Sequence, residues 1–516
     1  MNSETTGSEA RQPGLLSPVG FALLFAVFAV MHFQSLTGLS LTADDDHAFF
    51  RLDPAVWVQQ GRWGAYLVER FILPLPVITF VPYALFGGCL CVSFALIATT
   101  VGVSTVSWTV LLAFALFVGV PQWLFIMEFS ANIVAIGLGF LCASASAFAF
   151  YKASDEALSP LRRVALAAPS VLLLCLAASL YQALLIAGLL LSSAVLVVQF
   201  ARAEIGLTVA LLMHAGIAAA GAIAYALCVA VNEIFFLLLP YLHRANFYAD
   251  ILFRPFEALR NIHRGWMAAI AAYEAVVWGK NGFYGTSVVA FGLSTLVATI
   301  VVVVFAVRNG AVRGVLVALW VALAWLAVVA FQLAAGGPYV PFRAMVQLPA
   351  LVAVLAIVSL SITTKGMRMA ILFLFAVAVF QESVVINRAA ASHELVATRD
   401  AYIAGDLFRR IASVGRKGAD GLYRVQTLGL SPGLPAYPMP STSYMAFSWF
   451  AHEARQSFRV VQYMRMLGYP VSSVGMWRGA EAFSEQWASM PSWPAEGSVM
   501  AVGDVTLVKL GEVPGL

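Results

Sequence analysis

Residues 15–37, LLSPVGFALLFAVFAVMHFQSLT, form a long apolar run, which is followed closely by residues 41–70, LTADDDHAFFRLDPAVWVQQGRWGAYLVER. A run of about 18 or more apolar residues is long enough to cross a bilayer as a helix. We expect residues 15–37 to be a retained membrane anchor, because this run is too long for a signal peptide and lacks a small-residue cleavage site. The chain is then expected to enter a polar compartment at its three adjacent acids, residues 44–46.

The composition extends this interpretation to the whole chain. Of the 516 residues, 61% are hydrophobic and only 11% are charged, whereas soluble domains carry about 25% charged residues. The mean hydropathy is +0.87, so we expect a polytopic α-helical membrane protein. The five cysteines all lie in apolar runs, which indicates small buried side chains instead of a zinc site or disulfides. No repeat, nucleotide-binding glycine loop or nucleic-acid motif is visible, so nucleic acid is not an expected partner.

Eleven apolar segments are expected to span the membrane. If the N-terminus is cytoplasmic, alternate loops carry Lys or Arg, as the positive-inside rule requires of cytoplasmic loops. The other loops then face the opposite side, together with the tail after residue 386. The segments lie near residues 15–37, 74–99, 103–120, 131–151, 164–180, 182–201, 205–232, 284–307, 314–335, 344–362 and 369–386.

Polarity divides the chain into two expected domains, a membrane domain at residues 1–386 and a soluble domain at residues 387–516. The tail has a helical pattern over about residues 390–414. It ends in alternating β-branched residues at 499–510. We therefore expect a small α/β domain on the extracytoplasmic side of the membrane.

The first candidate site is the cluster Asp44, Asp45 and Asp46. A carboxylate can act as general base toward an attacking hydroxyl, and a neighbouring acid can raise its pKa or help to hold a divalent cation such as Mg²⁺ or Mn²⁺. The alternative is that one aspartate caps a helix starting near His47 while the others are solvated. Three acids at the C-terminal end of a helix oppose its dipole, which favours a catalytic role. The sequence itself requires no metal ion.

The second candidate site consists of basic residues in the loops where the positive-inside rule does not place them, foremost Arg62, His243, Arg244 and Arg343. The planar fork of arginine binds phosphate through two hydrogen bonds, so these residues predict a site for a lipid-linked phosphate at the membrane surface. The alternative is that they pair with nearby acids or with the headgroups of membrane lipids. Arg343 is the strongest single candidate, because it ends the GGPYVPFR turn at the mouth of a helix.

Polar and aromatic residues near the ends of the expected spans are candidates for substrate binding. Glu128 lies in an otherwise apolar, re-entrant-looking segment, where a carboxylate needs a partner. Tyr181 and Gln182 form a short turn between two spans, although a tyrosine at this level also suits an interfacial anchor. Trp63, which follows Arg62 directly in the sequence, is a further candidate for substrate binding.

These motifs resemble a known family. Adjacent aspartates in the first loop followed by Gly61-Arg62-Trp63 are similar to the first loop of the bacterial serotype-converting O-antigen glucosyltransferases, which are polytopic glycosyltransferases of the GT-C type. The SLYQALL segment, with Tyr181 and Gln182, resembles the same family. So does the last span, followed by a helix that begins at Asn387 and leads into a tail.

The resemblance implies a membrane glycosyltransferase at the periplasmic face of the bacterial inner membrane. The expected donor is a polyprenyl-phosphate sugar such as undecaprenyl phosphate glucose, and the expected acceptor is a cell-surface glycan such as the O-antigen of lipopolysaccharide. The first-loop acid is the expected base, so this role falls on Asp44 or Asp45, and the third acid, Asp46, leaves the choice open. Two alternatives are a polymerase or ligase of lipid-linked glycans and a flippase. Few mid-span charges and no repeat argue against the flippase.

Overall fold

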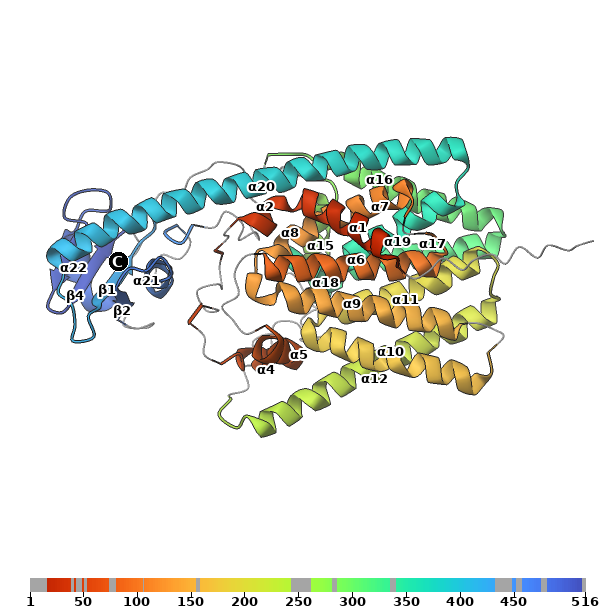
Figure 1. Ribbon diagram of the computed structural model, residues 1–516, viewed down its shortest axis with the longest axis horizontal. Coiled ribbons are helices and arrows are strands. Elements are labelled where there is room, and N and C mark those ends of the chain that lie inside the picture. Colours follow the sequence, from red (N-terminus) through yellow and green to blue (C-terminus); the bar gives the residue numbers. More distant parts are fainter. Residues whose placement is uncertain are drawn as a thin grey trace, which may run out of the picture.

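The computed structural model describes residues 16–38, 41–42, 49–50, 53–73, 80–104, 106–154, 158–242, 261–280, 285–334, 340–431, 448–451, 457–474 and 480–512. These residues form a bundle of helices lying side by side, and one long helix connects this bundle to a small sheet domain (Figure 1). The helices of the bundle are α1 (Pro18–Met31), α2 (Phe33–Thr37), α6 (Val81–Val101), α7 (Trp108–Gly119), α8 (Pro121–Met127), α9 (Ser130–Ala153), α10 (Pro160–Leu180), α11 (Ala183–Ala201), α12 (Leu207–Leu238), α16 (Val289–Arg308), α17 (Ala311–Val328), α18 (Ala330–Ala334) and α19 (Gln347–Ile362).

Short helical elements lie where the chain passes between the long helices. Four of them are α4 (Val56–Gln59), α5 (Trp63–Leu67), the π-helical turn η1 (Val68–Ile72) and the 3₁₀ turn η2 (Phe342–Ala344). The fifth is the amphipathic α15 (Ile262–Val276). Of the predicted site residues, Trp63 lies in α5, Arg343 lies in η2 and Arg62 directly precedes α5.

Each of the eleven apolar segments contains a helix, which confirms the polytopic helical class. Within the described ranges, eight helices are long and apolar enough to cross a membrane, and the bent pair α7–α8 makes a ninth if it is one span. The two remaining segments correspond to α1 and α19, which are apolar but shorter. The number of eleven crossings therefore stays a prediction.

A bend of 52° separates α7 from α8. Helix α7 ends at Gly119, and α8 begins with Pro121 in its first turn. Proline has no N–H to continue the hydrogen-bond ladder of the preceding helix, and it disfavours helical geometry in the residue before it. The proline therefore turns the chain at the start of α8, which ends directly before Glu128.

Two adjacent glycines in α6 provide a test of the packing in the bundle. A Cβ on Gly87 would lie 2.3 Å from Cε1 of the fully buried Phe28 ring, whereas a Cβ on Gly88 would lie 3.9 Å from its nearest neighbour, Phe21 Cζ. We expect Gly87→Ala to lower the free energy of unfolding by about 1–3 kcal/mol through overpacking. Gly88→Ala should be neutral or stabilise by up to about 1 kcal/mol, because alanine favours helix. Thermal unfolding in detergent measures the stability of both variants. Equal unfolding midpoints for Gly87→Ala and Gly88→Ala would contradict the close packing of Gly87 against Phe28.

Helix α20 (Lys365–Val414) runs without interruption from the bundle into the tail. Its apolar first part packs against α7 and α16. A helix of 50 residues extends about 75 Å, which is more than twice the hydrocarbon thickness of about 30 Å. The second half of α20 therefore extends past the bundle and carries the tail (Figure 1).

The tail contains a four-stranded sheet with the order β2-β1-β4-β3. Strand β1 (Tyr423–Leu428) pairs in parallel with β2 (Val471–Ser473) and with β4 (Val505–Lys509). Strand β3 (Val499–Val502) pairs antiparallel with β4, and both lie where the alternation of residues 499–510 predicts strands. Among the tail residues that the structure describes, three short helices accompany the sheet: α21 (Ser457–Met466), the 3₁₀ turn η3 (Ala480–Phe483) and α22 (Ser484–Ser489).

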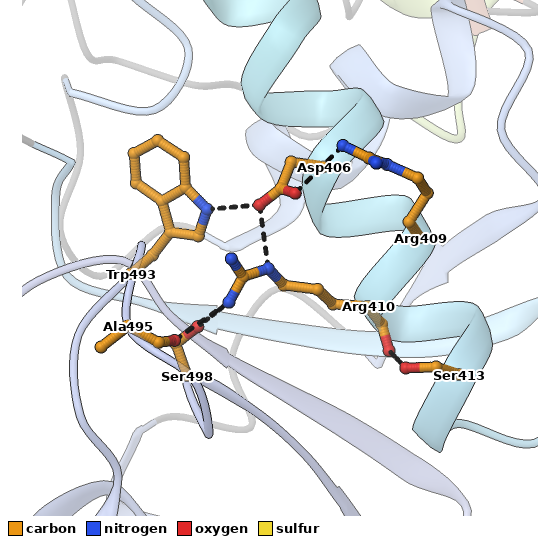
Figure 2. A network of polar contacts seen from close by, with 7 residues as sticks. All are labelled: Asp406, Arg409, Arg410, Ser413, Trp493, Ala495 and Ser498. Carbon is orange, nitrogen blue, oxygen red and sulfur yellow. Dashed lines mark hydrogen bonds and ion pairs between the residues drawn. The ribbon is translucent and has the colours of Figure 1, made fainter.

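A polar network fastens the end of α20 to the segment before β3 (Figure 2). The Asp406 carboxylate accepts hydrogen bonds from Trp493 Nε1 at 3.0 Å and from Arg410 Nε at 2.9 Å. Arg410 Nη1 donates in turn to the Ala495 carbonyl at 3.0 Å. Hydrogen bonds to charged groups are stronger than neutral ones, so this network holds α20 and the sheet together.

A buried acid on α20, beyond the apolar span, makes the stability of the tail depend on pH. The Asp400 carboxylate accepts hydrogen bonds from Ser448 Oγ and from the Trp449 N–H, both at 2.7 Å. Burial raises the pKa of Asp400 to about 7, compared with about 3.9 in an unfolded chain. Between these values the folded tail binds one more proton than the unfolded tail. The contribution of Asp400 to stability is therefore largest at acidic pH and falls as the pH rises toward 7.

The variant Asp400→Asn should remove this contribution while it keeps the side-chain shape. We expect the difference in melting temperature between wild type and Asp400→Asn to fall steadily from pH 5 to pH 7 and to level off above it. The neighbouring His393, whose pKa burial lowers to about 4, is present in both proteins and cancels in the difference. Fluorescence of the tail tryptophans follows the unfolding, and a difference that does not change with pH would contradict the burial of this acid.

Candidate active site

The basic residues of the short loops gather at one end of the bundle. Arg202 donates from Nη1 to the Val101 carbonyl at 3.0 Å and from Nη2 to Ser361 Oγ at 3.1 Å. Asn309 Nδ2 donates to the Ala201 carbonyl at 2.9 Å. These contacts bring together the C-terminal ends of α6, α11, α16 and α19. The N-terminal ends of α11 and α19, where several predicted site residues lie, are therefore at the opposite end, which we call the site end.

Arg62 is fixed at the site end by two adjacent residues of a distant segment, Tyr181 and Gln182. Its Nε donates to Gln182 Oε1 at 3.1 Å, and its guanidinium carbon lies 4.8 Å from the centre of the Tyr181 ring. Gln182 Nε2 donates in turn to the Gln60 carbonyl at 2.6 Å. The Gly-Arg-Trp turn and the Tyr-Gln turn, two separate motifs in the sequence, thus form one cluster.

A second set of residues supports this cluster. The guanidinium of Arg62 also lies 5.8 Å from the ring of Trp57, whose Nε1 donates to Glu69 Oε2 at 2.5 Å. The close approach of α5 to α10 depends on Gly64, because a Cβ there would lie 2.3 Å from Ser179 Oγ. The glycine and the buried Glu69 therefore hold Arg62 against the end of α10.

Arg343 lies in η2, directly before α19, and its guanidinium carbon is 4.4 Å from the centre of the Phe129 ring. The backbone beside it is fixed by Gln122, whose Nε2 donates to the Phe342 carbonyl at 2.6 Å. Phe125 packs edge-on against the ring of Phe342 at 5.4 Å. The turn that carries Arg343 is thus seated on α8 and on the residue that follows Glu128.

Gln347 joins the start of α19 to the start of α11. It is fully buried in the first turn of α19, and its Nε2 donates to the Ala183 carbonyl at 3.1 Å. Ala183 follows Gln182, the partner of Arg62, and Gln347 lies about one helical turn after Arg343. Arg62 and Arg343 therefore lie at the starts of two helices, α11 and α19, that the Gln347 hydrogen bond joins.

Thr42 ties the first loop (residues 38–55) to the same end of the bundle. Its hydroxyl donates to the Glu128 carbonyl, and both residues are 1% exposed. Thr42 precedes Asp44 by two residues in the sequence. The predicted acids Asp44, Asp45 and Asp46, and the predicted phosphate ligands His243 and Arg244, lie outside the described residues.

Comparison with known protein families matches residues 33–360 to the family described as Glucosyl transferase GtrII. The chain belongs to this family. The matched range extends from α2 to the end of α19 and includes every predicted site residue. Searches of curated proteins and of solved structures find no match. The chain is thus a glycosyltransferase, and its family indicates glucosyl transfer in O-antigen modification, as the resemblance implied.

Trp63 has a packing role in this GtrII family member. Its side chain is 7% exposed, its Nε1 donates to the Cys228 carbonyl at 3.2 Å, and its ring stacks on Phe235 at 6.0 Å. These contacts join α5 to α12. The indole N–H of Trp63 is thus already bonded within the protein. Substrate binding by Trp63 stays a prediction.

Several residues that build this glucosyltransferase's site end were not predicted from the sequence. Gln347 and Phe129 lie within apolar segments and have no local motif around them. A lone amide in an apolar span is the one signal that could have identified Gln347, because a buried amide requires partners. No group of three or more metal-ligating side chains occurs within the described ranges, a search that does not include residues 44–46. The divalent cation remains an expectation.

Proposed function

We propose that this glucosyltransferase transfers glucose from a polyprenyl-phosphate donor to a cell-surface glycan at the periplasmic face of the inner membrane. The observations that carry the proposal lie at one end of the bundle: Gln182 binds Arg62, Gln347 joins the start of α19, directly after the turn of Arg343, to the start of α11, and Thr42 binds the Glu128 carbonyl. Two arginines at helix ends suit a phosphate at the level of the membrane surface, where the lipid tail can lie between the helices. By the positive-inside rule the opposite, basic end is cytoplasmic, so the N-terminus is cytoplasmic and the tail is periplasmic.

The proposed reaction is a direct displacement. Asp44, Asp45 or Asp46 removes the proton from an acceptor hydroxyl, whose oxygen then attacks the anomeric carbon of glucose. The bond between that carbon and the phosphate oxygen breaks, and polyprenyl phosphate leaves with the electron pair. The negative charge that develops on the leaving phosphate is stabilised by the cationic ligands, for which we propose Arg62, Arg343, His243 and Arg244.

Arg62 is prepared for this role by its surroundings. Gln182 binds its Nε, and the aromatic rings of Trp57 and Tyr181 lie against the guanidinium. A cation held in a fixed orientation loses little freedom when the donor binds. We assign Glu128, Tyr181 and Gln182 to binding of the sugar, and Asp44–Asp46 are the residues that would hold a divalent cation if one takes part.

A polymerase or ligase of lipid-linked glycans would use the same cationic end but a different donor. Purified protein in detergent micelles should be given a labelled polyprenyl-monophosphate glucose, a polyprenyl-diphosphate oligosaccharide or a nucleotide-linked glucose, each with an acceptor glycan. The proposal predicts label transfer from the monophosphate donor alone. Transfer from the diphosphate oligosaccharide would identify a polymerase or ligase, and transfer from the nucleotide sugar would exclude the lipid donor.

A further inference from the structure

The tail contacts the first loop on both sides of the acid cluster. Leu41, before the acids, packs against the hydrophobic core of the tail, which includes Ile403 and Leu407 of α20. Phe50, after the acids, lies beneath Arg465, whose guanidinium carbon is 4.3 Å from the centre of the Phe50 ring. The two contacts flank residues 44–46 in the sequence.

The position of Arg465 within the tail is fixed by the packing of its helix. It lies in the last turn of α21, next to the fully buried Met464, and α21 packs against β1 and β2. In Figure 1, α21 lies on the side of the tail that faces the bundle, and α22 lies farther from it. The position of the whole unit is set by the unbroken α20 and by the Asp406 network. The tail can therefore hold Leu41 and Phe50 of the first loop in defined places.

The loop is also fixed to the bundle, through the hydrogen bond from Thr42 to the Glu128 carbonyl. Leu41 and Thr42 are neighbours, yet one packs on the tail and the other on α8. The segment that carries the acids thus starts at the point where the two parts of the protein meet. The family match ends at residue 360, so it does not include α20 or the tail.

We propose that the tail is part of the active site and that Arg465 is a positioning residue for the catalytic acid. The tail holds the first loop through its contacts with Leu41 and Phe50, and we call this pair of contacts the clasp. The Arg465 cation over the Phe50 ring and the packing of Leu41 in the tail core fix one described residue before the acids and one described residue after them. This inference rests on the proposed function for the role of the acids. The clasp itself is a claim about proximity, which is tested independently of glucosyl transfer.

Proximity is tested by cross-linking in a full-length protein whose five cysteines are replaced. In the double variant Phe50→Cys/Arg465→Cys, a short bis-maleimide reagent should join the two cysteines in membranes. The matched control combines Phe50→Cys with Glu485→Cys, an exposed position on α22, and should not be joined. Equal cross-linking of both pairs, or of neither, would overturn the clasp, whatever donor the enzyme uses.

Positioning is tested by steady-state kinetics of Arg465→Ala. Misplacement of a catalytic group by about 1 Å can cost about 100-fold in rate, so we expect kcat to fall roughly 10- to 100-fold while KM for the donor stays unchanged. Arg465→Lys keeps a cation for the Phe50 ring and should restore part of kcat. Arg424→Ala, which removes another tail arginine that pairs with Asp420, should match wild type. If Arg465→Ala also matches wild type per folded molecule, Arg465 does not position the acid.

Discussion

Replacing the catalytic acid of the first loop by its amide should lower glucosyl transfer by about 10²–10⁴-fold, the usual contribution of a general base. Asp44→Asn, Asp45→Asn and Asp46→Asn are made singly, because the base is one of the three. The amide keeps the shape of the side chain but cannot accept the proton of the acceptor hydroxyl. The variant that removes the base should therefore lose kcat and still bind the lipid donor. Transfer of labelled glucose in membranes, at matched protein levels, measures the effect.

Asp53 provides a matched control in the same loop. Its carboxylate accepts hydrogen bonds from the Ala55 N–H at 3.1 Å and from the Tyr241 hydroxyl at 2.5 Å. Because these contacts are structural, Asp53→Asn should lower stability by about 0.5–1.5 kcal/mol, the cost of one ordinary hydrogen bond, and should match wild type in transfer per folded molecule. Full transfer in all three first-loop variants would remove the base from residues 44–46. Glu128 would then be the next carboxylate to replace.

Arg343→Ala should have the second largest effect. Hydrogen bonds to charged groups contribute about 1.5–3 kcal/mol, so loss of the arginine should lower kcat/KM for the donor about 10- to 150-fold. Arg343→Lys should recover only part of this, because an ammonium group cannot form the paired hydrogen bonds of a guanidinium. Donor titrations with purified protein measure kcat/KM, and thermal unfolding checks that the variants are folded.

The control for Arg343 lies at the basic end of the bundle. The guanidinium carbon of Arg313 lies 5.6 Å from the centre of the Phe200 ring, an arrangement similar to that of Arg343 over Phe129. Arg313→Ala thus removes a cation from an aromatic ring without touching the site end, and it should leave kcat/KM unchanged. Equal losses in the two variants would show that Arg343 acts through general stability and not through the donor.

The helical class of the fold could be predicted from the sequence, because a membrane-spanning helix is determined by a local property, the length of its apolar run. The same holds for the strands of residues 499–510, which follow a local alternation. The continuity of α20 could not be read in this way. Its apolar and polar halves look like separate elements, and only the structure shows that one helix joins them.

The candidate site was predictable as separate pieces but not as an arrangement. Arg62 and Gln182 lie 120 residues apart and are joined by a single hydrogen bond, a pairing that depends on how α5 packs against α10. Trp63 follows Arg62 in the same motif, yet its side chain faces α12 and serves packing. The contact of Arg465 with Phe50 joins segments near opposite ends of the chain, and no local pattern indicates it.

The location of the donor site is the central claim, and photo-cross-linking tests it most directly. A polyprenyl-phosphate glucose with a photoreactive group near the phosphate is irradiated with the protein in liposomes, and the labelled peptides are identified by mass spectrometry. We predict labelling around Arg62, Tyr181 and Arg343, at the site end. An apolar cavity lined by Val198, Arg202 and Val358 lies at the opposite end of α11 and α19, about 28 Å away for a helix of 19 residues. Labelling confined to that cavity would contradict the account.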